Sequence, residues 1–174
     1  MTDKPKTFAV NGKLWGAKAR DWAELQEVQF RPGYAAVIAR FLKPGSRFLD
    51  VGCGSGVAAQ MAAAQGVKVS GIDAAQSLFA IARERTSAGD FRVADMEELP
   101  FGDAAFDLVT GFNAFQYAGN PVKALAEAGR VVKPDGHVVI VTWGPPDNMP
   151  AASLLAALRP LLPPPPPGAR QSGR

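Results

Sequence analysis

The chain has 174 residues, of which 47% are hydrophobic and 20% charged, the composition of one soluble globular domain with a real core. Its net charge is +3, but the lysines and arginines are scattered and form no basic stripe interleaved with aromatic residues, so no nucleic-acid groove is indicated. One cysteine and one histidine exclude an internal disulfide and a Cys/His zinc cluster, and we expect no metal site. No apolar run approaches the roughly 18 residues of a membrane span, so we expect a cytoplasmic protein.

Residues 1–46 are predicted to form a helical cap segment. Apolar side chains recur at helical spacing over Trp15–Leu42, and Pro32-Gly33 predicts a break between two helices.

Residues 47–143 are predicted to form an α/β core. Five strands are expected, at Arg47–Val51, Lys68–Ile72, Phe91–Ala94, Phe106–Gly111 and His137–Trp143. Helices are expected at Val57–Gln65, Gln76–Ser87 and Pro121–Val132, and Lys133–Gly136 predicts a turn before the fifth strand. Strands that alternate with helices predict a parallel sheet with right-handed crossovers, whose ligand lies at the carboxyl ends of the strands.

Residues 144–174 differ in composition from the core. They predict a Pro-rich linker at Gly144–Pro150, a short helix at Ala151–Leu162, and a polyproline stretch at Pro163–Pro167 before a polar tail.

The most specific pattern is the run Phe48-Leu-Asp-Val-Gly-Cys-Gly-Ser-Gly56, a strand that leads into three alternate glycines. Such glycines allow a ligand to approach the backbone closely. In a dinucleotide-binding turn of the form G-x-G-x-x-G, the third glycine would stand at Val57. The carboxylate of Asp50 would repel a pyrophosphate and attract an ammonium group. A nucleotide-dependent oxidoreductase is therefore disfavoured, and a tight turn without a ligand is the structural alternative.

With its glycines spaced D-x-G-x-G-x-G, this run resembles the first motif of class I S-adenosylmethionine-dependent methyltransferases. The resemblance implies a Rossmann-like, doubly wound, mostly parallel sheet with S-adenosylmethionine as the cofactor. Its amino acid end would lie at a set of residues from the motif: Asp50, Gly52, Cys53, Gly54 and Gly56. Cys53 is interpreted as a small turn residue rather than a nucleophile.

Two further strand ends match the family. Asp73 ends the second strand about twenty residues past the glycines and can accept hydrogen bonds from both ribose hydroxyls, with Ala74 beside it. Asp73 could also serve as the N-cap of the helix that starts near Gln76. After the third strand, Asp95 can accept from an adenine amine and Met96 offers a polarizable surface to the purine ring.

In class I methyltransferases the loop after the fourth strand faces the sulfonium and the acceptor, which implies roles for Phe112 and Asn113. Phe112 could contact the cation with its ring, or Phe112 and Phe115 could be core aromatics. The aromatic residues of the cap, Trp15, Trp22 and Tyr34, are candidates for facing cofactor or acceptor, with core packing as the alternative.

Methyl transfer needs alignment of the acceptor and exclusion of water more than a catalytic triad. Glu97, Glu98 and His137 are candidates for removing an acceptor proton, and the sequence favours none of them, so the catalytic residues are left unassigned.

Within the family, the chain looks most like small-molecule methyltransferases of the ubiquinone and menaquinone C-methyltransferase-like group. Family members normally continue past the fifth strand with two more strands, so the fold is expected to be C-terminally truncated. The exposed fifth strand could then pair with a second copy or another partner. We expect a methyltransferase that acts on a small organic acceptor. The alternative is a non-catalytic or partner-dependent S-adenosylmethionine-binding protein. No Asn-Pro-Pro-Tyr-like motif of a nucleic-acid methyltransferase follows the fourth strand.

Overall fold

The computed structural model describes residues 7–144 and 157–161. Residues 1–141 belong to one compact unit and residues 142–174 to a second. In the second unit residues 157–161 are helical, ending in the short 3-10 helix η5 (Arg159–Leu161). The rest of the predicted helix at Ala151–Leu162, the linker from residue 145 and the polyproline stretch lie outside the described residues.

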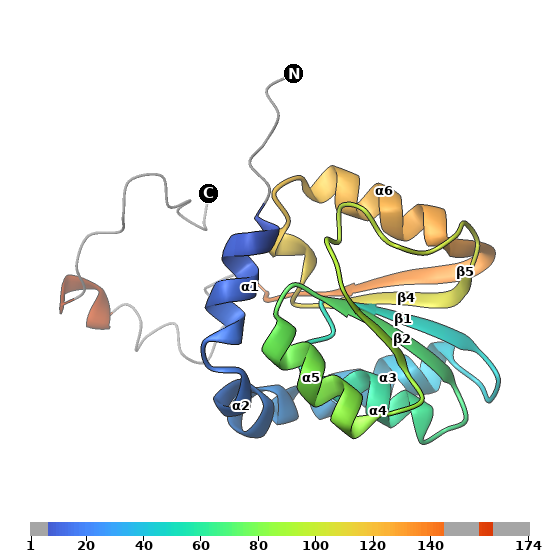
Figure 1. Ribbon diagram of the computed structural model, residues 1–174, viewed down its shortest axis with the longest axis horizontal. Helices are drawn as coiled ribbons and strands as arrows, with labels where there is room; N and C mark the ends of the chain where they lie inside the picture. Colours follow the sequence, from blue (N-terminus) through green and yellow to red (C-terminus); the bar gives the residue numbers. More distant parts are fainter. Residues whose placement is uncertain (1–6, 145–156, 162–174) are drawn as a thin grey trace. The chain divides into compact units, whose positions relative to one another are not determined.

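The first unit is built on a five-stranded parallel sheet in the order β3-β2-β1-β4-β5 (Figure 1). The strands are β1 (Arg47–Val51), β2 (Lys68–Asp73), β3 (Asp90–Val93), β4 (Phe106–Phe112) and β5 (Val132–Val141). The chain winds outward from β1 to β3 and then returns to the other side of β1. The strand order therefore reverses between β1 and β4, which is where open α/β sheets bind their ligands.

Helices cover both faces of this sheet (Figure 1). On one face lie α3 (Arg31–Phe41), α4 (Val57–Ala63) and α5 (Gln76–Arg85), and on the other lies α6 (Pro121–Val131). Each face has its own hydrophobic cluster: Ile38, Phe48 and Val57 belong to the first, and Leu49 and Val131 to the second. The doubly wound α/β fold predicted from the sequence is confirmed.

The cap is more irregular than predicted. It consists of α1 (Phe8–Gly16), α2 (Ala19–Asp21), the π-helix η1 (Trp22–Gln26) and the 3-10 helix η2 (Glu27–Phe30), followed by α3. The predicted break at Pro32-Gly33 is wrong. Pro32 lies in the first turn of α3, where its missing N–H needs no partner within the helix.

The predicted turn at Lys133–Gly136 is also wrong, because β5 already begins at Val132. Phe106 pairs with Val132 and Leu108 with His137, so this segment is an irregularity within the strand pairing. A Cβ at Gly136 would lie 2.8 Å from the carbonyl oxygen of Asp107, which explains the glycine without a turn. The strand ends at Val141 instead of Trp143. A short 3-10 helix, η3 (Phe115–Tyr117), was not predicted.

Helix α1 packs against the turn that joins β2 to α5. A Cβ at Gly12 would lie 2.5 Å from the carbonyl oxygen of Ala74, and the Ser77 hydroxyl donates to the carbonyl of Gly16 (3.0 Å). The absence of a side chain at Gly12 thus allows the cap to rest on the end of β2.

The substitution Gly12→Ala is expected to push α1 off this turn and to lower the free energy of unfolding by about 1 to 3 kcal/mol, as overpacking does. The matched control is Gly33→Ala in α3, where a Cβ would meet nothing within 4 Å. It should raise stability by about 0.5 to 1 kcal/mol, the gain of alanine over glycine in a helix. Urea denaturation measures both, and equal effects of the two substitutions would contradict the close packing of α1.

Candidate functional site

The turn after β1, here called the glycine loop (Gly52–Gly56), lies at the carboxyl end of the sheet. The amides of Gly52 and Cys53 both donate to the carbonyl of Ile72 in β2, each at 2.8 Å. Gly52, Gly54 and Gly56 have φ angles of +73°, +54° and +80°, which L side chains rarely adopt. The alternate glycines are therefore needed for the shape of this turn.

Asp50 belongs to β1, two residues before the glycine loop, and its side chain is buried beside Thr110 of β4. Its carboxylate accepts a hydrogen bond from the Thr110 hydroxyl at 2.7 Å. Burial raises the pKa of Asp50 to about 7, with smaller increases from the charges of Glu27 and Asp73, while the Thr110 hydrogen bond opposes the shift. A cation near this carboxylate would offset the cost of burying its negative charge. This fits the ammonium group expected from the sequence.

Asp73, at the end of β2, accepts hydrogen bonds from the glycine loop and from the turn after β2. One carboxylate oxygen accepts from the amide of Gly54 (2.9 Å) and the other from the amide of Ala75 (2.8 Å). Burial raises the pKa of Asp73, and these backbone hydrogen bonds oppose the rise. The alternative role of Asp73 as N-cap of α5 is wrong, since Ala75 occupies that position without a side-chain cap. Each oxygen of Asp73 retains a lone pair for a further donor.

Cys53 is buried, and burial raises the pKa of its thiol well above the ordinary value. A Cβ at Gly71 would lie 2.9 Å from its sulfur, so Cys53 fills a small space between β1 and β2. A protonated thiol in this position is a packing group.

Asp95 and Met96 follow β3 at the same edge of the sheet. Asp95 accepts from the amide of Glu97 (3.0 Å), and Met96 is partly buried against the cluster under α6.

Of the candidate bases, Glu97 is buried and accepts from the amide of Asn120 (2.8 Å), and Glu98 is exposed. The third, His137, packs on Phe41 and pairs with Leu108, four residues before the carboxyl end of β4 at Phe112.

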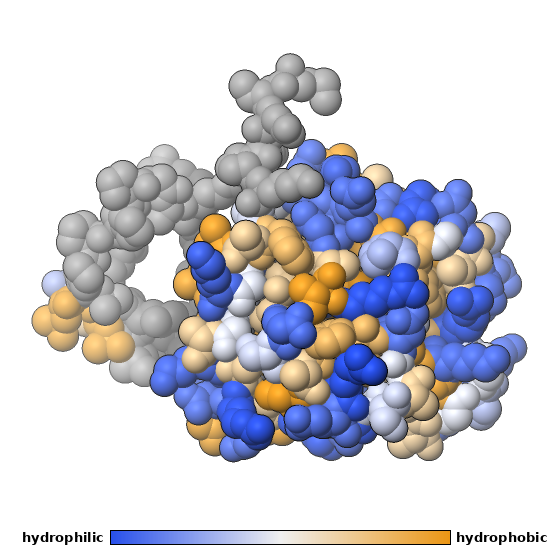
Figure 2. Space-filling model, in the orientation of Figure 1, coloured by the Kyte–Doolittle hydropathy of each residue, from blue (hydrophilic) through white to orange (hydrophobic). Residues whose placement is uncertain are grey.

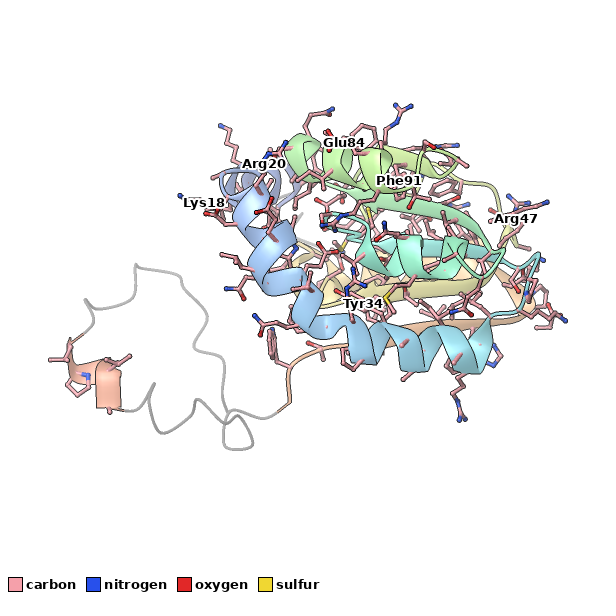
Figure 3. The ribbon with its side chains drawn as sticks, turned by 90° about the horizontal axis from the view of Figure 1, so that it is seen from below. Lys18, Arg20, Tyr34, Arg47, Glu84 and Phe91 are labelled. Carbon is pink, nitrogen blue, oxygen red and sulfur yellow. The ribbon has the colours of Figure 1, made fainter. Side chains whose placement is uncertain are left out.

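Phe112 and Asn113 stand at the end of β4. Phe112 is partly buried, and its ring centroid lies 4.5 Å from that of Tyr34, a buried residue that points from α3 toward the sheet (Figure 3). Phe115 is buried in the core, which agrees with the alternative given for it in the sequence analysis. Asn113 has φ +52°, and its amide donates to Val141 (2.7 Å). Its side-chain Oδ1 is buried and accepts no hydrogen bond from the described part of the chain.

Aromatic residues of the cap lie over the glycine loop. Trp22 reaches it, because a Cβ at Gly54 would be 3.2 Å from Nε1 of the indole. The Trp22 ring contacts Trp15 (5.0 Å between centroids) and Phe30 (6.3 Å), so the residue that reaches the loop belongs to an aromatic layer of the cap. Elsewhere the surface is mixed: Figure 2 shows apolar and hydrophilic residues interspersed over the face that carries α1 and α5.

Glu27 is the residue of this region that the sequence did not reveal. Its carboxylate is buried and accepts from the amides of Ser55 (3.0 Å) and Val57 (3.2 Å) and from the Ser55 hydroxyl. Regular helical spacing would have buried Leu25, which is 65% exposed. The π-helix at Trp22–Gln26 changes the phase of the segment, so Glu27 faces the loop instead.

Two absences hold for the described residues 7–144 and 157–161. They contain no group of three or more His, Cys, Asp or Glu side chains that could hold a metal ion. They also include no helix with the length and hydropathy to cross a bilayer.

A doubly wound parallel sheet with this loop at its switch point defines a cofactor-binding α/β domain. Residues 49–140 match the family described as "Methyltransferase domain", and the chain therefore belongs to that family. This confirms the resemblance to class I S-adenosylmethionine-dependent methyltransferases and identifies S-adenosylmethionine as the cofactor.

Two curated relatives illustrate the similarity. The chain is 33% identical over 163 residues to a ubiquinone biosynthesis O-methyltransferase of Xanthomonas campestris pv. campestris, covering 91% of this chain and 66% of the relative. It is 32% identical over 142 residues to a demethylmenaquinone methyltransferase of Renibacterium salmoninarum, covering 82% of this chain and 56% of the relative. The chain thus spans less than two-thirds of the length of each.

Among solved structures, the fold resembles the [4+2]-cyclase SpnF with a TM-score of 0.66 and 26% identity. The match covers 78% of this chain and 60% of the cyclase. The fold alone therefore does not specify the reaction.

The raised pKa of Asp50 predicts a pH-dependent stability. Its folded-state pKa of about 7 exceeds the ordinary 3.8, so its stabilising contribution is complete below 3.8 and is lost as pH rises to about 7. Asp50→Asn keeps an acceptor for Thr110 without the charge. Relative to this variant, the wild type should lose about 2 kcal/mol of unfolding free energy between pH 5 and pH 8. Urea denaturation at both pH values measures the loss, and a pH-independent difference would contradict the assignment.

The geometry at Asn113 predicts that a substitution there weakens ligand binding without a large change in the free energy of unfolding. Glycine tolerates φ +52°, so Asn113→Gly should change the free energy of unfolding by less than about 1 kcal/mol. If the unpaired Oδ1 accepts from a ligand, the same variant should bind S-adenosylhomocysteine about tenfold more weakly. Denaturation and calorimetric titration measure the two effects. A large loss of stability with unchanged affinity would assign Asn113 a structural role.

Proposed function

We propose that this chain carries the cofactor-binding part of a methyltransferase that transfers a methyl group from S-adenosylmethionine to a small organic acceptor. The observation that supports this most strongly is the glycine loop, with three left-handed glycines tied to Asp73 and placed above the buried Asp50. The relatives named as quinone-biosynthesis methyltransferases support a small-molecule acceptor. A non-catalytic role has no observation in its favour.

The residues present fit this cofactor in three respects. The negative charges near the loop suit its ammonium and sulfonium groups, and Asp73 retains lone pairs for ribose hydroxyls. The buried Oδ1 of Asn113 lacks a partner among the described residues, as expected of a group that a ligand satisfies. We propose the whole predicted set as the binding site: Asp50, Gly52, Cys53, Gly54, Gly56, Asp73, Ala74, Asp95, Met96, Phe112 and Asn113.

A pyrophosphate-bearing cofactor fits less well. The amides of Ser55 and Val57, at the start of α4, already donate to the carboxylate of Glu27. A phosphate would have to displace this carboxylate and approach Asp50 and Asp73 as well. The charges of the site therefore favour a cationic ligand over a dinucleotide.

In the proposed reaction, the bound cofactor supplies a methyl carbon activated by its sulfonium. On transfer, the methyl carbon would bond to an acceptor lone pair, the C–S electron pair would return to sulfur, and the proton of the acceptor would pass to water. The chain contributes alignment, through the loop and Asp73, and exclusion of water, through the aromatic layer around Trp22. We assign no catalytic base.

The domain organisation and partners belong to the same proposal. We propose a cap at residues 1–46, a cofactor-binding core at 47–143 and a Pro-rich tail at 144–174, in a cytoplasmic protein. Within the described sheet β5 is an outermost strand, and Val138 and Ile140 are 37% and 45% exposed. This supports association through β5 with a second copy or another partner, which light scattering of the purified chain would detect.

Calorimetric titration with S-adenosylmethionine, S-adenosylhomocysteine and NADH tests the proposal. The first two should bind and NADH should not. Asp73→Ala should weaken binding about 10- to 100-fold, the worth of charge-assisted hydrogen bonds. The matched control is Asp90→Ala, at the opposite end of the sheet, where Asp90 pairs with Arg92 (2.7 Å). Tighter binding of NADH, or equal losses in both variants, would contradict the proposed site.

A further inference from the structure

Glu27 is a buried carboxylate whose hydrogen-bond donors all come from one short segment. It is 3% exposed, and its donors are the amide and hydroxyl of Ser55 and the amide of Val57. Burying a carboxylate costs several kcal/mol unless its partners compensate. An exposed side chain at this position would avoid that cost, so the burial indicates that the cap is fixed to the loop through Glu27.

Arg85, near the end of α5, completes the arrangement. Its guanidinium donates to the carbonyls of Ser55 and Ala23, both at 3.1 Å, and to the Ser55 hydroxyl. Burial raises the pKa of Glu27, the hydrogen bonds from Ser55 and Val57 oppose this increase, and the positive charge of Arg85 opposes it to a smaller extent. One polar cluster thus joins the cap to the core. It consists of Glu27 and Ala23 of the cap, Ser55 and Val57 of the core, and Arg85 of α5.

This cluster acts on the backbone that the proposed cofactor site uses. Ser55 lies between Gly54, whose amide donates to Asp73, and Gly56, whose φ is +80°. The indole of Trp22 lies against Gly54, on the same cap segment as Glu27. Apolar contacts such as those of Trp22 are not directional, whereas hydrogen bonds to buried amides fix one register of the cap on the loop.

We propose that Glu27 is a positioning residue that fixes residues 8–30 on the glycine loop, so that cofactor affinity depends on Glu27 through Ser55 and Val57. The inference deepens the proposed function and rests on it for the identity of the ligand. The cluster couples closure of the cap to the shape of the loop. A cap released from the loop would leave the aromatic layer without a fixed place over the site.

Two measurements on the full chain test this inference: amide hydrogen exchange without ligand, and calorimetric titration with S-adenosylhomocysteine. Glu27→Ala should raise exchange at least about tenfold within residues 8–30, leave β1 and β4 protected, and weaken affinity at least about tenfold. Glu27→Gln keeps one carbonyl acceptor and should recover part of both effects. The matched control, Glu24→Ala, alters an exposed acid of the same segment and should behave as the wild type.

Three results would overturn the inference. The first is Glu27→Ala with affinity within about twofold of the wild type. The second is loss of protection throughout the sheet in both Glu27 variants, which would make Glu27 a residue of general stability. The third is an unchanged exchange rate in residues 8–30. A wild-type protein that binds no S-adenosylhomocysteine would contradict the proposed function, while the exchange measurement would still decide whether Glu27 holds the cap.

Discussion

The backbone of the glycine loop is the constraint on which the rest of the structure depends. Apart from the amide of Gly56, which donates to the carbonyl of Cys53 within the loop, its amides and that of Val57 donate to three acceptors outside it: the carbonyl of Ile72, the carboxylate of Asp73 and the carboxylate of Glu27. A buried amide that loses its acceptor costs about 1 to 3 kcal/mol. The loop therefore keeps its shape only when the sheet, the turn after β2 and the cap are all in place, and the fold and the site stabilise each other.

The same residues determine the charge of the site. Burial raises the pKa of Asp50, Asp73 and Glu27, and the charges of Asp73 and Glu27 further raise that of Asp50. A cationic ligand reduces this electrostatic cost, whereas a phosphate increases it. The charge arrangement and the family membership thus support the same cofactor, with the indole of Trp22 next to the loop.

The sheet was predictable because most of its strands have a short apolar core and alternate with helical segments, and β1 was predicted with its exact bounds. Two errors came from residues that usually end an element. Pro32 instead fits the first turn of α3, and Gly136 instead allows close contact inside β5. Glu27 was missed because a π-helix, which no local pattern indicated, turns it toward the loop. The place of Asn113 directly after β4 was predicted from the strand end, but its buried Oδ1 without a partner among the described residues was seen only in the structure.

The central claim is that S-adenosylmethionine binds at the carboxyl ends of β1, β2 and β4 beneath the cap. It is tested most directly by amide and indole NMR shifts during titration with S-adenosylhomocysteine. The account predicts the largest changes in the glycine loop, at Asp73, at Asn113 and at the indole of Trp22, with small changes at His137. Changes concentrated at the amino ends of the strands, or none at saturating ligand, would contradict it.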